Sequence, residues 1–182
     1  GTKTLSLKIE AAAIAIATNQ LRDGQVGTAY ADTLESTGGT PPYQYSLLSG
    51  SLPTGLQLKA TSGILSGTPE AYGDFSFTVE VGDASNPRKQ ASKTLSVTIY
   101  PAKLAIVTDS LRSVSIDDEY TDTIQVSGGM PPYRWSIING SLPDGLLLDS
   151  LTGIVAGIVT AQGSAVFTVR VKDSQNPPDT VS

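Results

Sequence analysis

The chain has 182 residues and a net charge of −5, and it contains neither histidine nor cysteine. An acidic chain without a cluster of Lys and Arg cannot displace counterions from phosphates, so nucleic acid is excluded as a partner. The missing histidine and cysteine exclude the commonest general base, the commonest transition-metal ligand and all thiol and disulfide chemistry.

The first ten residues carry the pattern of a strand. Leu5, Leu7 and Ile9 alternate with polar residues, which is typical of a strand with one buried face. The segment TKTLSLKIEAAAIAIATNQL also matches a later one, SKTLSVTIYPAKLAIVTDSL, which begins at Ser92. Residues 1–10 are therefore predicted to be the last strand of a preceding repeat, orphaned in this chain or exchanged between chains.

The match belongs to a repeat that runs through the whole chain. Gly38 recurs as Gly128 and Phe77 recurs as Phe167, a constant step of 90 residues (128 minus 38) without insertion or deletion. A unit of this length buries enough surface to form a core of its own. The sequence therefore predicts two similar domains.

The predicted boundaries place the first domain at 11–100 and the second at 101–182. The second lacks its last strand in this prediction, because Ser182 corresponds to Ser92. An unpaired sheet edge and an orphan strand complement each other. We expect residues 3–10 of one chain to complete the second domain of a neighbour, head to tail.

Alternation of apolar and polar residues predicts the strands inside a repeat. Phe75, Phe77, Val79 and Val81 point to one side while the residues between them point to the other. Turns of Gly, Pro, Ser and Asn separate such segments about every ten residues, and no window has helical spacing. The predicted strands of the first repeat lie near residues 14–18, 29–36, 43–48, 56–59, 64–66, 74–82 and 93–99. Seven short strands fit an all-β, immunoglobulin-like Greek-key sandwich, present here in two tandem copies.

One long segment of each repeat carries a family resemblance. In the first copy it reads GGTPPYQYSLLSGSLPTGLQLKATSGILSGTPEAYGDFSFTVEVGD, from Gly38 to Asp83. It resembles the He_PIG family of Ig-like domains, the dystroglycan-type, cadherin-like modules of bacterial surface and secreted proteins. The second copy departs from the pattern at Ile158-Val159, where the first has Thr68-Pro69. The resemblance implies an extracellular, multi-copy, non-catalytic module, for which calcium binding is commonly proposed.

The candidate metal site is the segment that follows the predicted strand at 74–82. Asp83 and Asn86, and their copies Asp173 and Asn176, resemble the Asp/Asn-rich calcium segments of cadherins. Calcium takes six to eight oxygen ligands, and cadherins place theirs at the linker between domains, which in this chain has no acidic residue. We prefer the alternative interpretation, an Asx-type turn that closes a hairpin. No cofactor is required, and calcium is the ion that these residues would take.

Further acidic residues have simpler interpretations. Asp117-Asp118-Glu119 occurs in the second copy only, which favours a solvated turn over a site. Asp32 and Asp122 occur in both copies, and we interpret them as rim residues that bind backbone. The remaining carboxylates, serines and lysines stand in no recognisable catalytic motif, so we expect no enzyme.

The aromatic residues allow two interpretations. Tyr133 and Trp135, with Tyr43 and Tyr45 in the first copy, have the ring faces on which sugars stack. The alternating positions of Tyr43 and Tyr45 favour packing inside the sandwich instead, and Trp135 takes the position of Tyr45. Core packing is the preferred interpretation, and carbohydrate contact is the alternative.

Together these patterns predict a spacer and adhesion stalk in a larger cell-surface or secreted protein. Its partners would be neighbouring repeats of the parent chain, and surface glycans or proteins. The alternatives are a carbohydrate-binding accessory module and a calcium-rigidified adhesion module. No run of the sequence is long and apolar enough to span a membrane.

Overall fold

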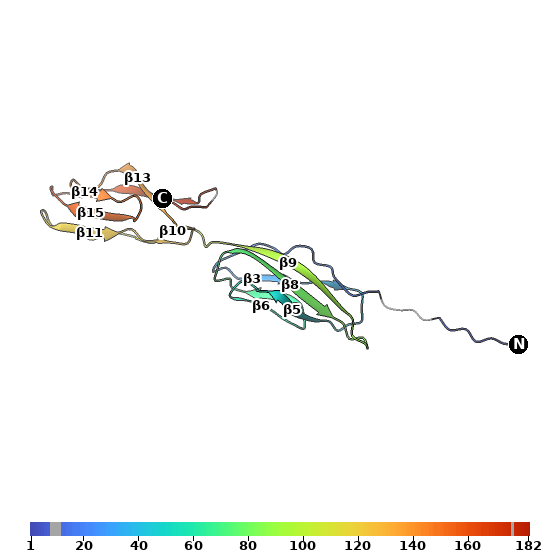
Figure 1. Ribbon diagram of the computed structural model, residues 1–182. Helices are drawn as coiled ribbons and strands as arrows, with labels where there is room; N and C mark the ends of the chain where they lie inside the picture. The colour runs from blue at the N-terminus through green and yellow to red at the C-terminus, as the bar shows by residue number, and fades with distance from the viewer. Residues whose placement is uncertain (8–11, 176) are drawn as a thin grey trace. The chain divides into compact units, whose positions relative to one another are not determined.

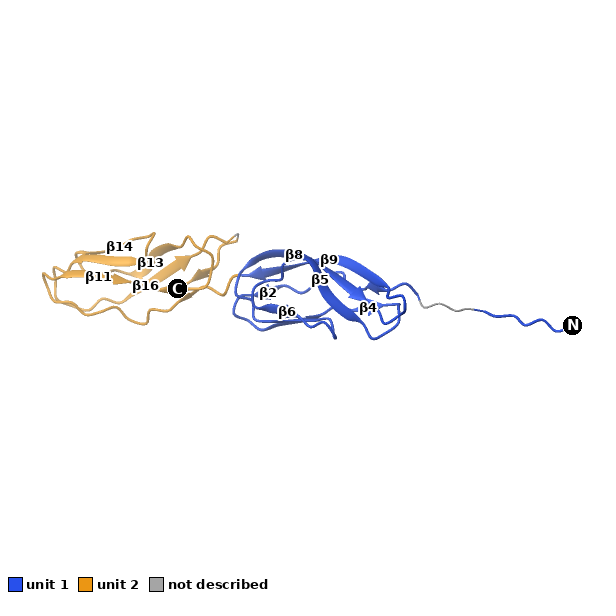
Figure 2. Cartoon of the chain, turned by 60° about the horizontal axis from the view of Figure 1, so that its bottom comes forward, with its two compact units in different colours: residues 1–100 blue, residues 101–182 orange. Residues whose placement is uncertain are grey.

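The computed structural model describes residues 1–7, 12–175 and 177–182. Within that part of the chain the secondary structure consists of strands without helices, so the predicted all-β class is confirmed. No membrane-spanning helix occurs among these residues. The chain divides into two compact units, Gly1–Tyr100 (unit 1) and Pro101–Ser182 (unit 2) (Figure 1 and Figure 2).

Unit 1 is a β-sandwich. One sheet has the order β3-β7-β6, the other has the order β2-β9-β8-β5, and β1 pairs with β4. All pairs are antiparallel except β2 with β9. The strands are β1 (Ala15–Ile16), β2 (Gly24–Gln25), β3 (Tyr30–Thr33), β4 (Ser36–Thr37), β5 (Gln44–Gly50), β6 (Leu56–Leu58), β7 (Ile64–Gly67), β8 (Gly73–Gly82) and β9 (Gln90–Tyr100).

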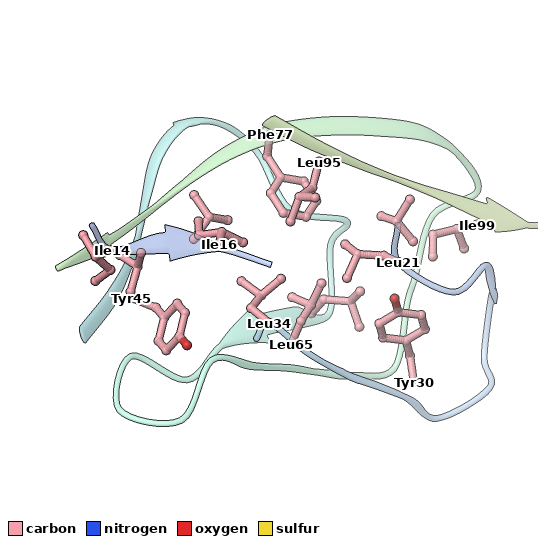
Figure 3. Close-up of a cluster of buried hydrophobic side chains, with 14 residues drawn as sticks. Ile14, Ile16, Leu21, Tyr30, Leu34, Tyr45, Leu65, Phe77, Leu95 and Ile99 are labelled. Carbon is pink, nitrogen blue, oxygen red and sulfur yellow. The ribbon is translucent and has the colours of Figure 1, made fainter. Parts of the chain in front are cut away.

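The core of unit 1 lies between the two sheets. Phe77 of β8 and Leu95 of β9 point toward Leu34 and Leu65, which come from the opposite side of the sandwich (Figure 3). These four side chains are at most 3% exposed. The alternation that predicted β8 therefore marks its buried face, because every second residue of a strand points to the same side.

The predicted strand at 29–36 is two strands in the structure. β3 pairs with β7 and β4 pairs with β1, and the buried Leu34 lies between them. The amide of Leu34 donates to the Gly63 carbonyl at 2.8 Å, so the chain changes partner here without leaving that amide unpaired. Alternation does not reveal such a change, because it records which face is buried and not which neighbour is bonded. The two-residue strand β2 was also missed.

Unit 2 repeats this architecture. Its sheets have the orders β11-β15-β14 and β13-β16-β17, and β10 pairs with β12. β5 and β13 even carry a register shift at the same place, after Leu47 and after Ile137. The strands are β10 (Ala105–Ile106), β11 (Glu119–Thr123), β12 (Val126–Ser127), β13 (Arg134–Gly140), β14 (Leu146–Leu148), β15 (Ile154–Ile158), β16 (Phe167–Lys172) and β17 (Thr180–Val181).

The turn at Ile158-Val159 is kept although its sequence differs between the copies. The amide of Thr160 donates to the Asp144 carbonyl at 3.2 Å, as the amide of Glu70 donates to Thr54 at 3.0 Å in unit 1. Val159 is 6% exposed and fills the buried place of Pro69. A buried apolar residue and the same backbone bond are thus enough to retain the turn.

The predicted strand at 1–10 lies partly outside the described residues, which omit 8–11. Residues 1–7 are exposed and form no strand in this structure. Leu5 is 81% exposed and Leu7 is 87% exposed, which is unusual for two leucines with strand alternation.

Candidate functional site

The buried carboxylate of Asp83 is the polar centre of unit 1. Asp83 directly follows β8 and is 4% exposed. Its Oδ2 accepts a hydrogen bond from the amide of Thr40 at 3.0 Å. Its Oδ1 accepts from the amide and hydroxyl of Ser85, at 3.2 and 2.6 Å, and from the amide of Lys89 at 2.9 Å. One carboxylate therefore joins the β8–β9 turn to the loop before β5.

Asp173 makes the corresponding set of bonds in unit 2. It is 6% exposed, and its Oδ2 accepts from the amide of Met130 at 3.0 Å. Its Oδ1 accepts from the amides of Gln175 and Asp179, at 3.1 and 2.7 Å. The side-chain amide of Gln175 donates to Oδ2 and takes the role of the Ser85 hydroxyl. We call the two aspartates with their donors the loop clamps.

Hydrogen bonding sets the charge of both clamps. The bond from the Ser85 hydroxyl, with those from three backbone amides, holds the pKa of Asp83 well below its usual value against the opposing effect of burial. Burial raises the pKa of Asp173, but the donors of Gln175, Met130 and Asp179 outweigh it and the pKa is lowered. Both carboxylates are therefore ionised at neutral pH, because each donor favours the charged form.

A glycine is needed beside each clamp. Gly39 and Gly129 have φ of 63° and 65°, which favours glycine. A Cβ on Gly39 would lie 2.9 Å from Oδ2 of Asp83, and a Cβ on Gly129 would lie 3.0 Å from Oδ2 of Asp173. The second glycine of each Gly-Gly pair in the repeat therefore admits the carboxylate.

The clamps bear directly on the calcium hypothesis. A carboxylate has about four lone-pair positions, and Asp83 and Asp173 each accept four hydrogen bonds. Asn86 is exposed, and Asn176 lies outside the described residues. Within residues 1–7, 12–175 and 177–182, no group of three or more acidic side chains is arranged to hold a metal ion. The geometry favours the turn interpretation, and calcium binding stays a prediction.

A second polar cluster occurs in both units and joins an arginine to the rim aspartate. Asp32 accepts from the amides of Arg22 and Thr33, both at 2.9 Å, and Arg22 Nε lies 3.7 Å from Asp32 Oδ2. Asp122 accepts from the amide of Arg112 at 3.1 Å in the same way. Both aspartates thus bind backbone, as their interpretation as rim residues predicts. The sequence analysis missed the arginines, although the step of the repeat carries Arg22 to Arg112.

A shallow cavity of about 540 Å³ borders this cluster in unit 1, lined in part by Arg22, Tyr30 and Tyr100. The hydroxyl of Tyr30 donates to the Arg22 carbonyl at 2.9 Å. Burial, and then the charge of Asp32, raise the pKa of Tyr30 to about 12. A phenol with this pKa keeps its proton at neutral pH and does not serve as a general base.

The aromatic residues lie where the core interpretation places them. Trp135 is 4% exposed and belongs to the core of unit 2. Tyr133 is half-buried, and its hydroxyl donates to the Gly128 carbonyl at 2.8 Å, as that of Tyr43 donates to Gly38 at 2.7 Å. An open groove of about 550 Å³ runs beside Trp135, between β13 and β14. Stacking of a sugar on Trp135 or Tyr133 stays a prediction, with little indole surface exposed for it.

The two cores differ by a coupled exchange. The hydroxyl of Tyr45 bonds to the Ser36 hydroxyl at 3.0 Å. At the same step unit 2 has Trp135 and Val126, so a polar pair is replaced by an apolar pair. The Trp135 ring also packs against Gly153, where an added Cβ would lie 2.7 Å from the indole.

Two sandwiches whose strands pair in the same order, apart from β2, which has no counterpart among the described strands of unit 2, define a tandem Ig-like β-sandwich protein, each unit with a clamped loop. The chain belongs to the He_PIG family, described as "Putative Ig domain", whose model matches residues 12–100 and 98–182. This confirms the resemblance for both repeats.

Solved structures with similarity to the chain include cadherin domains and a glycoside hydrolase. The protocadherin GammaB4 extracellular domain is 14% identical with a TM-score of 0.48, covering 93% of this chain and 33% of its own. Mouse cadherin-23 EC22-24 is 14% identical with a TM-score of 0.43, covering 92% of this chain and 61% of its own. An endo-fucoidan hydrolase of glycoside hydrolase family 107 is 20% identical with a TM-score of 0.42, covering 92% of this chain and 28% of its own. No curated protein sequence matches the chain.

Proposed function

We propose that the chain is a non-catalytic module that serves as spacer and adhesion stalk in a larger cell-surface or secreted protein. The observation that carries this proposal is that the polar side chains shared by both copies bind within their own unit. Asp83 and Asp173 hold loops, and Asp32 and Asp122 hold backbone at the sandwich rim. The polar side chains that both copies share therefore stabilise the fold of each unit.

The extracellular location is part of the proposal and rests on the family. He_PIG modules resemble the repeats of surface and secreted proteins, and such repeats add length between other domains. Carbohydrate binding and calcium rigidification are the competing roles for the same fold.

Unit 1 has a strand arrangement suited to bearing tension. β2 and β9 run parallel, and the amide of Val26 extends this pairing by donating to the Tyr100 carbonyl at 3.0 Å. β2 lies on the N-terminal side of the unit and β9 leads out of it. A pull on the two ends loads such a pair in shear, so its hydrogen bonds must break together. In unit 2, residues 114–115, which correspond to β2, form no strand in the described structure.

Single-molecule pulling on the whole chain tests the proposal. We expect two separate unfolding events, each extending the chain by roughly 250–300 Å for a unit of this size. Val26→Pro removes the donor to Tyr100 and should lower the force of the stronger event only. The matched control Ile116→Pro, at the equivalent place in unit 2, should leave that event unchanged.

The competing roles predict different results. Unfolding of the chain at forces too low to resolve two events would contradict the spacer role. Specific binding on a glycan array, or hydrolysis in a broad glycoside screen, would replace it with an accessory or enzymatic role.

A further inference from the structure

Asn139 is the one asparagine of the chain that precedes a glycine. The chain has four asparagines, of which Asn86 and Asn176 precede proline and Asn19 precedes glutamine. An asparagine side chain can react with the backbone nitrogen of the next residue, and glycine leaves that nitrogen most accessible because it has no Cβ. The nitrogen of proline carries no hydrogen and does not react in this way. The sequence therefore singles out Asn139-Gly140 for this reaction.

The fold requires the glycine at position 140. Gly140 has φ of 73°, and a Cβ there would lie 2.9 Å from Cα of Phe167 on the neighbouring strand β16. Gly50 takes the same place in unit 1 with φ of 78°, but it follows Ser49. An asparagine at this place must therefore precede glycine, and unit 2 is the copy that has one.

The side chain of Asn139 lies against the nitrogen that would attack it. The amide of Gly140 donates to Oδ1 of Asn139 at 3.0 Å, so the side-chain carbonyl is next to that nitrogen. When reacting groups are held about 3–3.5 Å apart, much of the entropy cost of their encounter is already met. Both residues are exposed, so hydroxide and water can reach them.

The side chain of Asn19 has a different partner. Its Oδ1 accepts a hydrogen bond from Nζ of Lys93 on β9 at 2.6 Å. This bond directs the side-chain carbonyl toward β9 rather than toward the next backbone nitrogen. Asn19 is therefore an internal comparison, since it is also exposed but is not held in position to react.

The backbone before Asn139 departs from a regular strand. The register of β13 against β16 shifts between Ile137 and Asn139, so Ile138 is an extra residue between two ladder pairs. A bulge of this kind disrupts the ladder locally. The ladder therefore restrains the backbone of Asn139 less than that of a residue in a regular strand, which favours closure of a ring onto Gly140.

We propose that Asn139 is a site of spontaneous deamidation, in which Gly140 supplies the attacking nitrogen. Hydroxide removes the proton of the Gly140 amide, and the nitrogen forms a bond to Cγ of Asn139. The bond from Cγ to Nδ2 breaks, and Nδ2 takes a proton from water and leaves as ammonia, which regenerates hydroxide. Water then opens the cyclic imide, giving isoaspartate when it attacks the backbone carbonyl and aspartate when it attacks Cγ. The net reaction consumes one water and releases one ammonia.

The isoaspartate product changes the sheet of unit 2. It adds a methylene to the backbone between residues 139 and 140, and it adds a carboxylate that is charged at neutral pH. Asn139 lies opposite Thr168 and Gly140 lies opposite Phe167, at one end of the β13–β16 ladder. The longer backbone moves Gly140 out of register with Phe167. Unit 2 therefore loses stability with age, whereas unit 1, with Ser49 at this place, does not.

Peptide mapping of the incubated protein tests the proposal. The natural chain is kept folded at pH 7 and at pH 8, well below its melting temperature, and samples are cleaved with trypsin. The peptide from Trp135 to Arg170 contains Asn139 as its only asparagine. We expect this peptide to gain the mass difference between an acid and an amide, in two chromatographic forms, about tenfold or more faster than the peptide with Asn19. The gain should be faster at pH 8, because attack requires the nitrogen without its proton.

An exchange of residues between the units is the matched control. In the variant Ser49→Asn/Asn139→Ser, each substitution installs the residue that the other unit has at that place, so both suit the fold. We expect the mass gain to move to the peptide that carries residue 49. If the peptide from Trp135 to Arg170 still gains mass in this variant, the change is at Gln162 and the proposal is wrong.

Two further results would overturn the proposal. The first is a mass gain in denaturant only, with none in the folded chain, because the proposal rests on the geometry of the folded unit. The second is aspartate as the only product, because direct hydrolysis by water gives aspartate alone and does not involve the nitrogen of Gly140.

The stability of the aged chain provides a second measurement. Asn139→Asp adds the same charge without lengthening the backbone, so it separates the two effects of the reaction. We expect the isoaspartate form, isolated by ion exchange, to unfold at a lower denaturant concentration than Asn139→Asp, which should unfold like the natural chain. Equal midpoints would contradict the loss of register. The spacer role does not depend on this reaction, so the pulling experiment can succeed where this one fails.

Discussion

Single side chains decide how the loops of each unit are held. Asp83 is the clearest case, because one carboxylate serves four donors from two loops. The pKa of Asp83 is lower in the folded chain than in the unfolded chain, where it is about 3.9. The carboxylate therefore stabilises the fold at pH values above about 3.9, and this stabilisation is lost as the pH falls further.

Asp83→Asn tests the clamp. The variant keeps the shape but turns one acceptor oxygen into a donor nitrogen, which faces amides that also donate. We expect the melting temperature of the chain at pH 7 to fall by about 4–8 °C, measured by calorimetry. The difference from the natural chain should narrow below about pH 4, where the aspartate of the unfolded chain becomes protonated and the stability contributed by the folded carboxylate begins to be lost. A pH-independent difference would mean that charge has no part in the clamp.

The exchanged core pair provides a coupling test. Trp135→Tyr places a hydroxyl near Val126, where unit 1 has Ser36 as its partner. Adding Val126→Ser should recover part of the lost stability, with a coupling of about 0.5–1.5 kcal/mol measured by chemical denaturation. Additive effects of the two changes would show that the pair does not interact.

Backbone strain can be tested at Asp117, which has φ of 65° where unit 1 has Gly27 with φ of 76°. Replacing Asp117 by Gly should stabilise unit 2 by about 0.5–1 kcal/mol, because the left-handed conformation costs less for glycine. The neighbour Asp118, whose φ is not positive, is the control, and Asp118→Gly should be neutral or destabilising. Chemical denaturation of both variants gives the comparison.

At the scale of the elements, the turn between β8 and β9 distinguishes the calcium-site interpretation of Asp83 from the turn interpretation. The turn between β8 and β9 is closed by hydrogen bonds from the protein itself.

Calcium should therefore have no effect on melting. We expect the melting temperature in 5 mM calcium, about the level needed for weak extracellular sites, to match that in EDTA within about 1 °C. A larger rise that disappears in Asp83→Asn would establish a calcium site at the clamp and overturn the turn interpretation.

For the whole molecule, the repeat made the fold predictable. A step without insertion means that the main strands are seen twice, so a position that is apolar in both copies marks the core, as with Val81 and Val171. The Gly-Gly pair was predictable in the same way, since both copies need positive φ there. The split of the predicted strand at 29–36 was not, because hydrogen-bond partners are set by residues distant in the chain.

The sequence by itself determined the all-β class, the two tandem Ig-like units and the buried faces of the main strands, because alternation and repetition are local properties. Only the tertiary structure showed that Asp83 and Asp173 are buried and that each accepts four hydrogen bonds. One donor of each set, the amide of Thr40 or of Met130, lies 43 residues earlier in the chain. The physical reason is that folding alone brings such donors together. The same carboxylates would suit a metal site or a loop clamp, and the assembled donors favour the clamp.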